Sequence, residues 1–346
     1  MIATTSEQPR RDNLEDKTMM RKPKQSRYHP GRLVRAAAVL TMAFAALGST
    51  SAATFPQHDI TFIVPYSPGG GSDLQARRLE PGLKKALGVN IHIVYKTGGG
   101  GAVGFLALHS AKPDGYTIAN VVVPNIIVTS QGKDVGYKPS DFSYIAMTET
   151  APDALVVKKD GKFKTLKDFV AYAKAHPGKL TIAGTGSTGK AHVAEIVHAL
   201  GIKVTYVPVS GGVGKIVPYL EGGHVDAAEF GASHVLEHTD IFRALGISGS
   251  EPSAAMPDVP TFASLGYKGF DSATTWGVMA PPGTPADIVK VLNKAVEKAV
   301  SDPGVQAALK KHGLTPLHQS PAQAKAYVLS NEKAVAKDKK LLTLVD

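Results

Sequence analysis

The chain has 346 residues, no cysteine and a formal net charge of +10 at pH 7. The lack of cysteine excludes disulfides, thiolate catalysis, zinc–thiolate sites and lipid anchors on cysteine. About half of the net charge lies before residue 54, and the remaining basic residues are too dispersed to predict nucleic-acid binding. The length is sufficient for two domains with well-buried cores.

The N-terminal region predicts a secretory signal peptide. Arg32 and Arg35 precede an apolar stretch at 36–47, and small residues lead to an expected cleavage after Ala53. Residues 1–53 are therefore predicted to be the leader of an exported protein. The candidate start residues are Met1, Met19 and Met20. No later segment reaches the roughly 18 uninterrupted apolar residues of a membrane span, so the mature chain is not expected to be membrane-embedded.

Short strand-like runs alternate with helical patterns along the rest of the chain. Strands are expected at residues 60–64, 91–95, 117–123, 154–157, 180–183, 204–207, 227–230 and 244–247. Apolar residues recur at helical spacing between them, and residues 285–309 are also expected to be helical. This alternation predicts an α/β protein with mostly parallel sheets, whose ligand lies beyond the carboxyl ends of the strands.

Two glycine-rich turns carry the strongest functional signal. Gly69, Gly70 and Gly71 follow the first strand and open a helix that Ser72 or Asp73 is expected to cap. The same construction recurs at 181–189, before a helix expected from 190 to 200. The first amides of a helix lack intrahelical partners and carry partial positive charge. Two such turns predict two lobes that hold one acidic ligand.

Two nucleotide-binding motifs are matched incompletely. The segment 184–190 nearly forms a phosphate-binding loop, but Ala191 replaces the Ser or Thr whose hydroxyl holds Mg²⁺. Gly99, Gly101 and Gly104 match the dinucleotide fingerprint, but no acidic residue follows at the end of the next strand. The first motif predicts anion binding near Lys190, and the second predicts a tight turn between a strand and a helix.

No constellation predicts catalysis. His234, Glu237 and His238 match an inverted zinc-hydrolase pattern, but no third ligand is apparent and a short polar helix is the preferred interpretation. No serine lies in a nucleophile elbow, and Asp73, Asp153 and Asp226 are not paired for acid–base chemistry. We therefore expect no catalytic residue, no metal site and no cofactor.

The order of these segments resembles a known family, the periplasmic solute-binding proteins of tripartite tricarboxylate transporters, often called the Bug family. The resemblance covers most of the chain after the leader and rests on six segments: residues 60–73, 95–101, 112–118, 184–192, 257–270 and 280–285. Tyr95 stands where the family usually has asparagine, and Phe230 and Trp276 are candidates to line the pocket, with core packing as the alternative.

The resemblance implies a type II periplasmic binding protein fold, with two α/β lobes joined by two crossing strands. Lobe one would comprise residues 54–156 and 275–346, and lobe two residues 157–274. The first turn and the turn of lobe two would hold a ligand carboxylate. The implied ligand-binding residues are Tyr66, Ser67, Gly70, Gly71, Ser72 and Asp73 in lobe one, and Thr185, Gly186, Ser187, Thr188, Gly189, His192 and Ser210 in lobe two.

The implied function is that of a monomeric, non-enzymatic receptor that delivers a carboxylate to integral-membrane transporter subunits. Two alternatives stay open at this point. The liganded protein signals to a sensor kinase instead, or the histidine-rich segment makes the chain a secreted metal-dependent hydrolase. The sequence also leaves open whether the ligand is an aliphatic di- or tricarboxylate, an amino acid or an aromatic acid.

Overall fold

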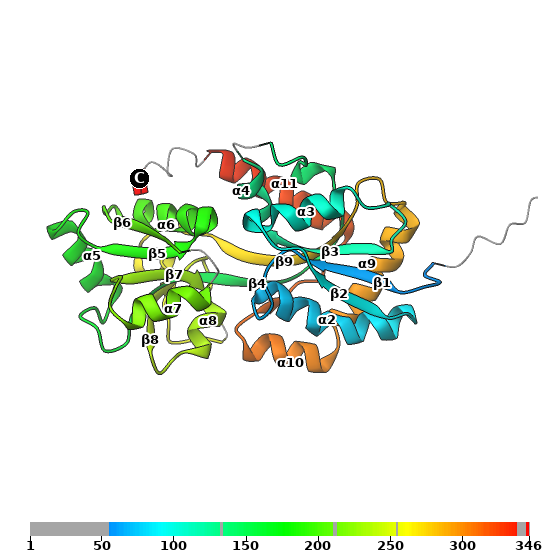
Figure 1. Cartoon of the computed structure of the whole chain (residues 1–346). Helices are drawn as coiled ribbons and strands as arrows, with labels where there is room; N and C mark the ends of the chain where they lie inside the picture. The colour runs from blue at the N-terminus through cyan, green and yellow to red at the C-terminus, as the bar shows by residue number, and fades with distance from the viewer. Residues whose placement is uncertain (1–54, 132–133, 210–212, 254, 338–343, 346) are drawn as a thin grey trace, which may run out of the picture. The chain divides into compact units, whose positions relative to one another are not determined.

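The computed structural model describes residues 55–131, 134–209, 213–253, 255–337 and 344–345. Its strands follow the order β2–β1–β3–β9–β4–β7–β5–β6, and β8 and β10 also pair with β4 (Figure 1). The strands are β1 Ile60–Val64, β2 Ile91–Tyr95, β3 Thr117–Val123, β4 Ser143–Lys158, β5 Thr181–Thr185, β6 Thr205–Val209, β7 Ala227–Gly231, β8 Phe242–Ile247, β9 Ala273–Ala280 and β10 Thr315–Pro316.

Helices cover both faces of the strands. The helices are α2 Gly71–Leu87, α3 Ala102–His109, α4 Asn125–Ser130, α5 Leu166–Ala175, α6 Gly186–Leu200, α7 Val213–Glu221, α8 Ala232–Glu237, α9 Ala286–Val300, α10 Pro303–Lys311 and α11 Pro321–Lys337, with short 3₁₀ turns at Gly99–Gly101, Pro139–Asp141 and Ala263–Leu265.

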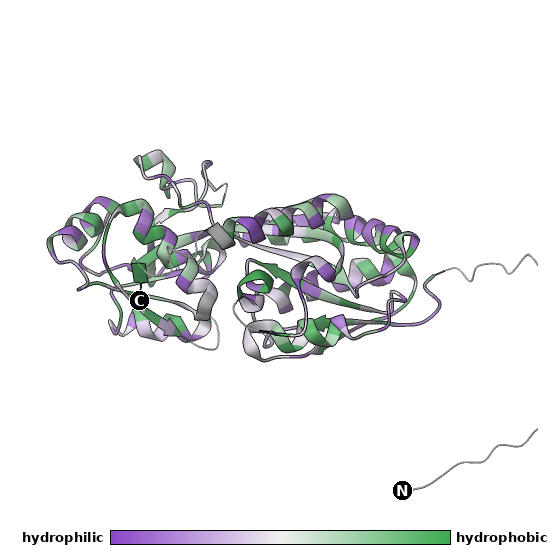
Figure 2. Ribbon diagram, turned by 90° about the horizontal axis from the view of Figure 1, so that it is seen from above, coloured by the Kyte–Doolittle hydropathy of each residue, from purple (hydrophilic) through white to green (hydrophobic). Residues whose placement is uncertain are grey.

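In the first lobe, β1 pairs in parallel with β2 and β3, and β9 runs antiparallel between β3 and β4. Ile60, Phe62 and Val64 belong to the core cluster that includes α2 and α9, whereas Ile63 packs with α3, α4 and α11 on the opposite face. A strand that is buried on both faces is mostly apolar, and β1, with four apolar residues and the half-buried Thr61, is therefore easily recognised from the sequence. Figure 2 shows the apolar residues of the strands and the mixed colouring of the helices.

In the second lobe, β5 pairs in parallel with β6 and β7, and β4 runs antiparallel to β7 and β8. The core on one face includes Phe169 of α5 and Ile196 of α6. The core on the other face includes Ile216 of α7 and Val235 of α8. The carboxyl end of β5 leads directly into the first residue of α6, Gly186.

Strand β4 belongs to both lobes. Its pairing partner changes from β9 to β7 and β8 between Pro152 and Asp153. The chain returns to the first lobe through β9, which pairs with β3 and with the first part of β4. The predicted α/β architecture of two lobes joined by two crossing strands is therefore confirmed. The lobe boundaries at residues 156 and 275 stay a prediction.

Two elements differ most from their expected bounds, while several other elements shift by a few residues at one or both ends. The strand expected at 154–157 begins at Ser143. Its first part was not recognised from the sequence because buried polar residues interrupt the apolar pattern, such as Thr148, whose Oγ1 donates to the Trp276 carbonyl at 3.2 Å. The helix expected at 285–309 is divided into α9 and α10, because Pro303 lacks an amide hydrogen and the Asp302 carboxylate caps a new helix. None of the helices in the described ranges is both long and apolar enough to cross a bilayer.

Candidate functional site

The first glycine turn connects β1 to α2. Gly69 has a φ of +84°, a conformation that favours glycine, and the helix begins at Gly71 with Gly70 as its N-cap. No side chain caps this helix. The prediction that Ser72 or Asp73 provides the cap was therefore wrong, since both lie inside the first turn of α2. The first turn consequently presents backbone amides rather than a capped end.

Asp73 holds this turn from within the helix. Its Oδ2 accepts from the Gly69 amide at 2.8 Å, and its Oδ1 accepts from Tyr95 Oη at 2.7 Å and from Arg77 Nε at 2.9 Å. Burial by itself raises the pKa of the Asp73 carboxyl, but the hydrogen bonds from Gly69 and Tyr95 and the charge of Arg77 outweigh it and lower the pKa. Both carboxylate oxygens are thus engaged in shaping the turn.

Aromatic side chains pack against or next to the same turn. Gly71 lies against the indole of Trp276, and a Cβ at this position would approach Trp276 Cζ2 to 2.8 Å. Tyr66 packs edge to face on Phe105, with ring centroids 6.3 Å apart, and burial raises the pKa of its hydroxyl. Ser67 is exposed. Trp276 is mostly buried, and it also lines a small cavity. It therefore packs in the core and contributes to a cavity wall, the two roles considered for it from the sequence.

The second glycine run supports the first turn rather than forming a nucleotide site of its own. All four glycines at 98–101 have positive φ values, and the following helix α3 packs closely on the first turn. A Cβ on Gly104 would lie 2.5 Å from Pro65 Cβ. Tyr95, just before this run, donates to Asp73. The tight turn between strand and helix expected for this segment is therefore observed.

The turn of lobe two connects β5 to α6. The helix begins at Gly186 with Thr185 as its N-cap, and no side chain caps it. It thus starts four residues earlier than expected and includes Ser187, Thr188 and Gly189 in its first turn. A Cβ on Gly189 would lie 2.6 Å from the carbonyl carbon of Gly184, so glycine at this position lets the helix approach the strand. The predicted residue Ser210 lies outside the described residues.

His192 is buried in α6 between two carboxylates. Its Nδ1 lies 2.9 Å from Glu229 Oε1 on β7 and 3.3 Å from Asp153 Oδ2 on β4. Burial by itself lowers the pKa of the His192 imidazole, but Asp153 and Glu229 outweigh it and raise the pKa to about 10. The three side chains form an ion-paired cluster, whose carboxylate and imidazole ligand atoms all lie within 4.8 Å of one another.

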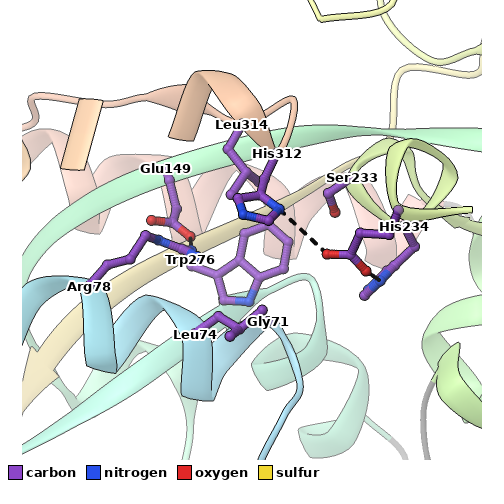
Figure 3. Close-up of a pocket in the computed structure, with 10 residues that line it drawn as sticks. Gly71, Leu74, Arg78, Glu149, Ser233, His234, Trp276, His312 and Leu314 are labelled. Carbon is purple, nitrogen blue, oxygen red and sulfur yellow. Dashed lines mark hydrogen bonds and ion pairs between the residues drawn. The ribbon is translucent and has the colours of Figure 1, made fainter. Parts of the chain in front are cut away.

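A small cavity lies beside the first turn, between side chains of both lobes (Figure 3). Its volume of about 20 Å³ is sufficient for roughly one water molecule, so it is not by itself a pocket for a metabolite. The lining residues are Gly71, Leu74, Arg78, Glu149, Ser233, His234, Glu237, Trp276, His312 and Leu314. Arg78 and Glu149 form an ion pair at one end of the cavity.

The zinc-like motif contributes to this cavity as an ion-pair cluster. His234 Nδ1 lies 3.2 Å from Glu237 Oε2, and His312 Nδ1 lies 3.5 Å from Glu237 Oε1. The hydrogen bond from His234, with the charges of His234 and His312, lowers the pKa of the Glu237 carboxyl although burial raises it. Helix α8 ends at Glu237, and His238 has non-helical dihedral angles. The hydrolase pattern requires both histidines on one face of a helix. His234 and His238 therefore do not meet this requirement.

The comparison with protein families decides the classification. Residues 75–344 match the family described as "Tripartite tricarboxylate transporter family receptor". The chain belongs to this family. Protein BugT of Bordetella pertussis is 33% identical over 285 residues, which are 80% of this chain and 87% of BugT. The resemblance inferred from the sequence motifs is thus confirmed.

Two solved structures of similar proteins contain small carboxylates. MatC from Rhodopseudomonas palustris with bound malate is 29% identical with a TM-score of 0.70, covering 84% of this chain and 100% of that chain. Rpa4515 from R. palustris with adipate is 26% identical with a TM-score of 0.76, covering 84% and 98%. The chain therefore has the expected type II periplasmic binding protein fold, which it shares with these two proteins.

Sequence reasoning missed part of the charge arrangement of this receptor. Asp153 was noted only as an unpaired acid, and Glu229 and Glu149 were not singled out. A sequence signal existed for Glu229, because an acid inside the apolar run of β7 must find a buried partner. Phe230 lies in the core of lobe two, as its alternative interpretation predicted. The ligand contacts assigned to the two turns stay a prediction.

Proposed function

We propose that the chain is a periplasmic solute-binding receptor that captures a small carboxylate between its two lobes. It then delivers the ligand to the membrane subunits of a tripartite tricarboxylate-type transporter. The observation that carries this proposal is a pair of helices, α2 and α6, one in each lobe. Each begins at a glycine that follows a strand, directly in α6 and after the turn 65–70 in α2, and neither has a side-chain cap.

Uncapped helix starts suit an anionic ligand. A helix N-terminus carries roughly half a positive charge, and its first amides point toward an incoming oxygen. Ser67 is exposed beside the first turn, and Gly70 has open space above it, since a Cβ there would meet only the Ser67 carbonyl oxygen at 3.6 Å. A dicarboxylate places one charge on each turn, which makes ligand binding and lobe closure a single process.

The relatives support this ligand class. Malate and adipate, bound in the structures of MatC and Rpa4515, are both dicarboxylates. We extend the ligand class to this chain, while the individual acid stays open among aliphatic, amino and aromatic acids. The proposed ligand contacts are those of the α2 and α6 turns, with Ser210 as a further predicted contact. Export through a cleaved leader, a monomeric state and the absence of catalysis complete the proposal.

Calorimetry with malate and adipate tests the ligand class, with the corresponding diamides as matched controls. We expect at least one diacid to bind and its diamide to show no heat, because the amide lacks the charge that the helix starts stabilise. Small-angle scattering at saturating ligand should show a smaller radius of gyration, and mass spectrometry should recover the ligand unchanged. Equal affinity for the diacid and its diamide contradicts the proposed site. Chemical conversion of the ligand by the protein would show that the protein is an enzyme.

Delivery to a transporter is tested by uptake of the ligand into cells that lack this gene. Loss of uptake that returns with the wild-type gene supports transport. Normal uptake together with a lost transcriptional response to the ligand favours the alternative in which the receptor signals to a sensor kinase.

A further inference from the structure

The buried cluster around His192 connects the proposed ligand turn of lobe two to a crossing strand. Asp153, His192 and Glu229 are 1%, 3% and 3% exposed, and they lie on β4, α6 and β7. Asp153 is the first residue of β4 that pairs with lobe two. His192 follows the first turn of α6 by one helical turn, and helical side chains lean toward the helix N-terminus. The ion pairs therefore attach this end of α6 to the point where β4 leaves lobe one.

The second crossing strand joins the same network. Thr274 of β9 donates to Asp153 Oδ1 at 3.1 Å. Ser272, just before β9, donates a hydrogen bond to Glu195, which lies one turn after His192 on α6. Ser248, after β8, accepts from the Asp153 amide at 2.9 Å and donates to the Ser272 carbonyl oxygen. Helix α6 is thus attached to both crossing strands through side chains that follow its first turn.

The network holds more negative than positive charge. One imidazolium, His192, faces the carboxylates of Asp153, Glu229 and Glu195. Tyr327 of α11 near Asp153 and Tyr206 of β6 near Glu229 are further titratable groups. Burial raises the pKa of both phenols above an ordinary value of about 10, so both are neutral at physiological pH. Burial, with the charges of Glu229 and Glu195, also raises the pKa of the Asp153 carboxyl to about 7, although His192 opposes this.

Asp153 Oδ2 contacts His192 Nδ1 at 3.3 Å as an ion pair without hydrogen-bond geometry, and His192 Nε2 has no hydrogen-bond partner among the described residues. Removing these charged groups from water is costly, and the pairing offsets that cost only in a well-defined geometry. An ion pair with no other task is replaced by apolar packing at little cost in stability.

We propose that Asp153, Glu229 and His192 are positioning residues that set the orientation of the α6 ligand turn relative to the two crossing strands, and that the proton count of this network changes that orientation. The positioning role concerns the orientation of the α6 turn and does not require a ligand. The expected effect of this orientation on ligand affinity rests on the proposed function. An acid with a raised pKa in the folded state stabilises it less as pH rises, so lobe two becomes less stable as Asp153 loses its proton around neutral pH.

Amide hydrogen exchange of the two ligand turns tests the positioning role. The variants are Asp153→Asn and Glu229→Gln, with Glu195→Gln as a milder change at a half-buried site. The matched control is Asp226→Asn, which removes a carboxylate that accepts from Thr181 at the other end of β5. We expect exchange of the first hydrogen-bonded amides of α6, at 189–192, to accelerate by about tenfold or more in the first two variants, with those of α2, at 74–77, unchanged. Wild-type protection of 189–192 in folded Asp153→Asn or Glu229→Gln overturns the proposal, and if neither folds, wild-type protection in Glu195→Gln does so.

The pH dependence separates positioning from simple structural support. Loss of the Asp153 proton between pH 6 and pH 8 should lower the melting temperature of the wild type by about 2–4 °C. Asp153→Asn should lose this decrease and Asp226→Asn should keep it. Adipate and malate affinities, measured over the same range, should weaken with rising pH in wild type and stay level in Asp153→Asn. An identical pH profile in both proteins refutes the proton-linked part.

The two proposals fail in distinguishable ways. If wild type binds neither malate nor adipate, the proposed ligand class is contradicted, but the exchange and melting measurements still decide the positioning role. If wild type binds and the exchange pattern of the variants equals that of wild type, the positioning proposal is wrong and the receptor function stands.

Discussion

The two glycine turns share a local pattern but are anchored in different ways. The β1–α2 turn is held within its own lobe by Asp73, whose carboxylate binds Gly69, Tyr95 and the partly exposed Arg77. The β5–α6 turn is followed by a buried charge network that reaches both crossing strands through Asp153. Lobe one therefore presents a locally fixed surface, whereas the turn of lobe two depends on the connection between the lobes.

This difference separates two tasks that a two-lobed receptor has to combine. A ligand changes the population of a closed state only by binding that state better than the open one. A turn that is fixed in lobe one provides a constant first contact. A turn attached to the crossing strands changes its presentation when those strands move. The next three predictions test the comparison, beginning with the largest expected effect.

Gly189→Val should have the largest effect, because it forces α6 away from β5. The new Cβ would lie 2.6 Å from the Gly184 carbonyl carbon and 2.8 Å from its Cα, and backbone atoms cannot rotate aside. We expect the free energy of unfolding to fall by about 1–3 kcal/mol and ligand binding to be lost. Chemical denaturation and calorimetry measure both effects. Gly214→Val is the control, since no atom lies near its Cβ position.

Gly70→Val should weaken binding without affecting folding. Gly70 has a φ of −86°, which a valine adopts without the strain of a left-handed residue, and only the Ser67 carbonyl oxygen lies near its Cβ position. The side chain would occupy the space of a ligand oxygen at the helix start. We expect an affinity loss of about 100-fold, or about 2.7 kcal/mol, and an unchanged melting temperature. Normal affinity in this variant would remove the first turn from the site.

Asp73→Asn should have the smallest effect and a different pH dependence. The amide cannot accept from Gly69, Tyr95 and Arg77 together, so we expect a loss of about 1–2 kcal/mol at pH 7. Because folding lowers the pKa of this carboxyl, its stabilisation is present above its unfolded pKa of about 4 and is lost as pH falls below that value.

Denaturation at pH 7 and pH 3 measures this change. The difference between wild type and Asp73→Asn should narrow in acid. Arg77→Ala, at a side chain that is 59% exposed, should lower the stability less than Asp73→Asn does and become neutral in high salt. A constant difference at both pH values would mean that the Asp73 charge does not hold the turn.

The sequence by itself determined the two-lobed α/β fold, the family and the positions of the glycine turns. The α/β pattern and the glycine turns follow from local rules, whereas the family and the fold with two crossing strands follow from the resemblance carried by six segments in order. A strand buried on both faces is mostly apolar, as in β1, and a helix that approaches a strand closely needs glycine, as at Gly104 and Gly189. The first three strands accordingly match their predicted bounds, 60–64, 91–95 and 117–123.

Only the tertiary structure decided how polar residues within the elements are used. The role of Asp73 depends on Tyr95, 22 residues away, and Asp153 meets Thr274 across 121 residues. Glu229 and His192 belong to different elements that become neighbours only when β7 pairs with β5 and α6 packs on the sheet. Charges interact through space and not along the chain, so the spacing of acids and histidines in the sequence could not reveal these contacts.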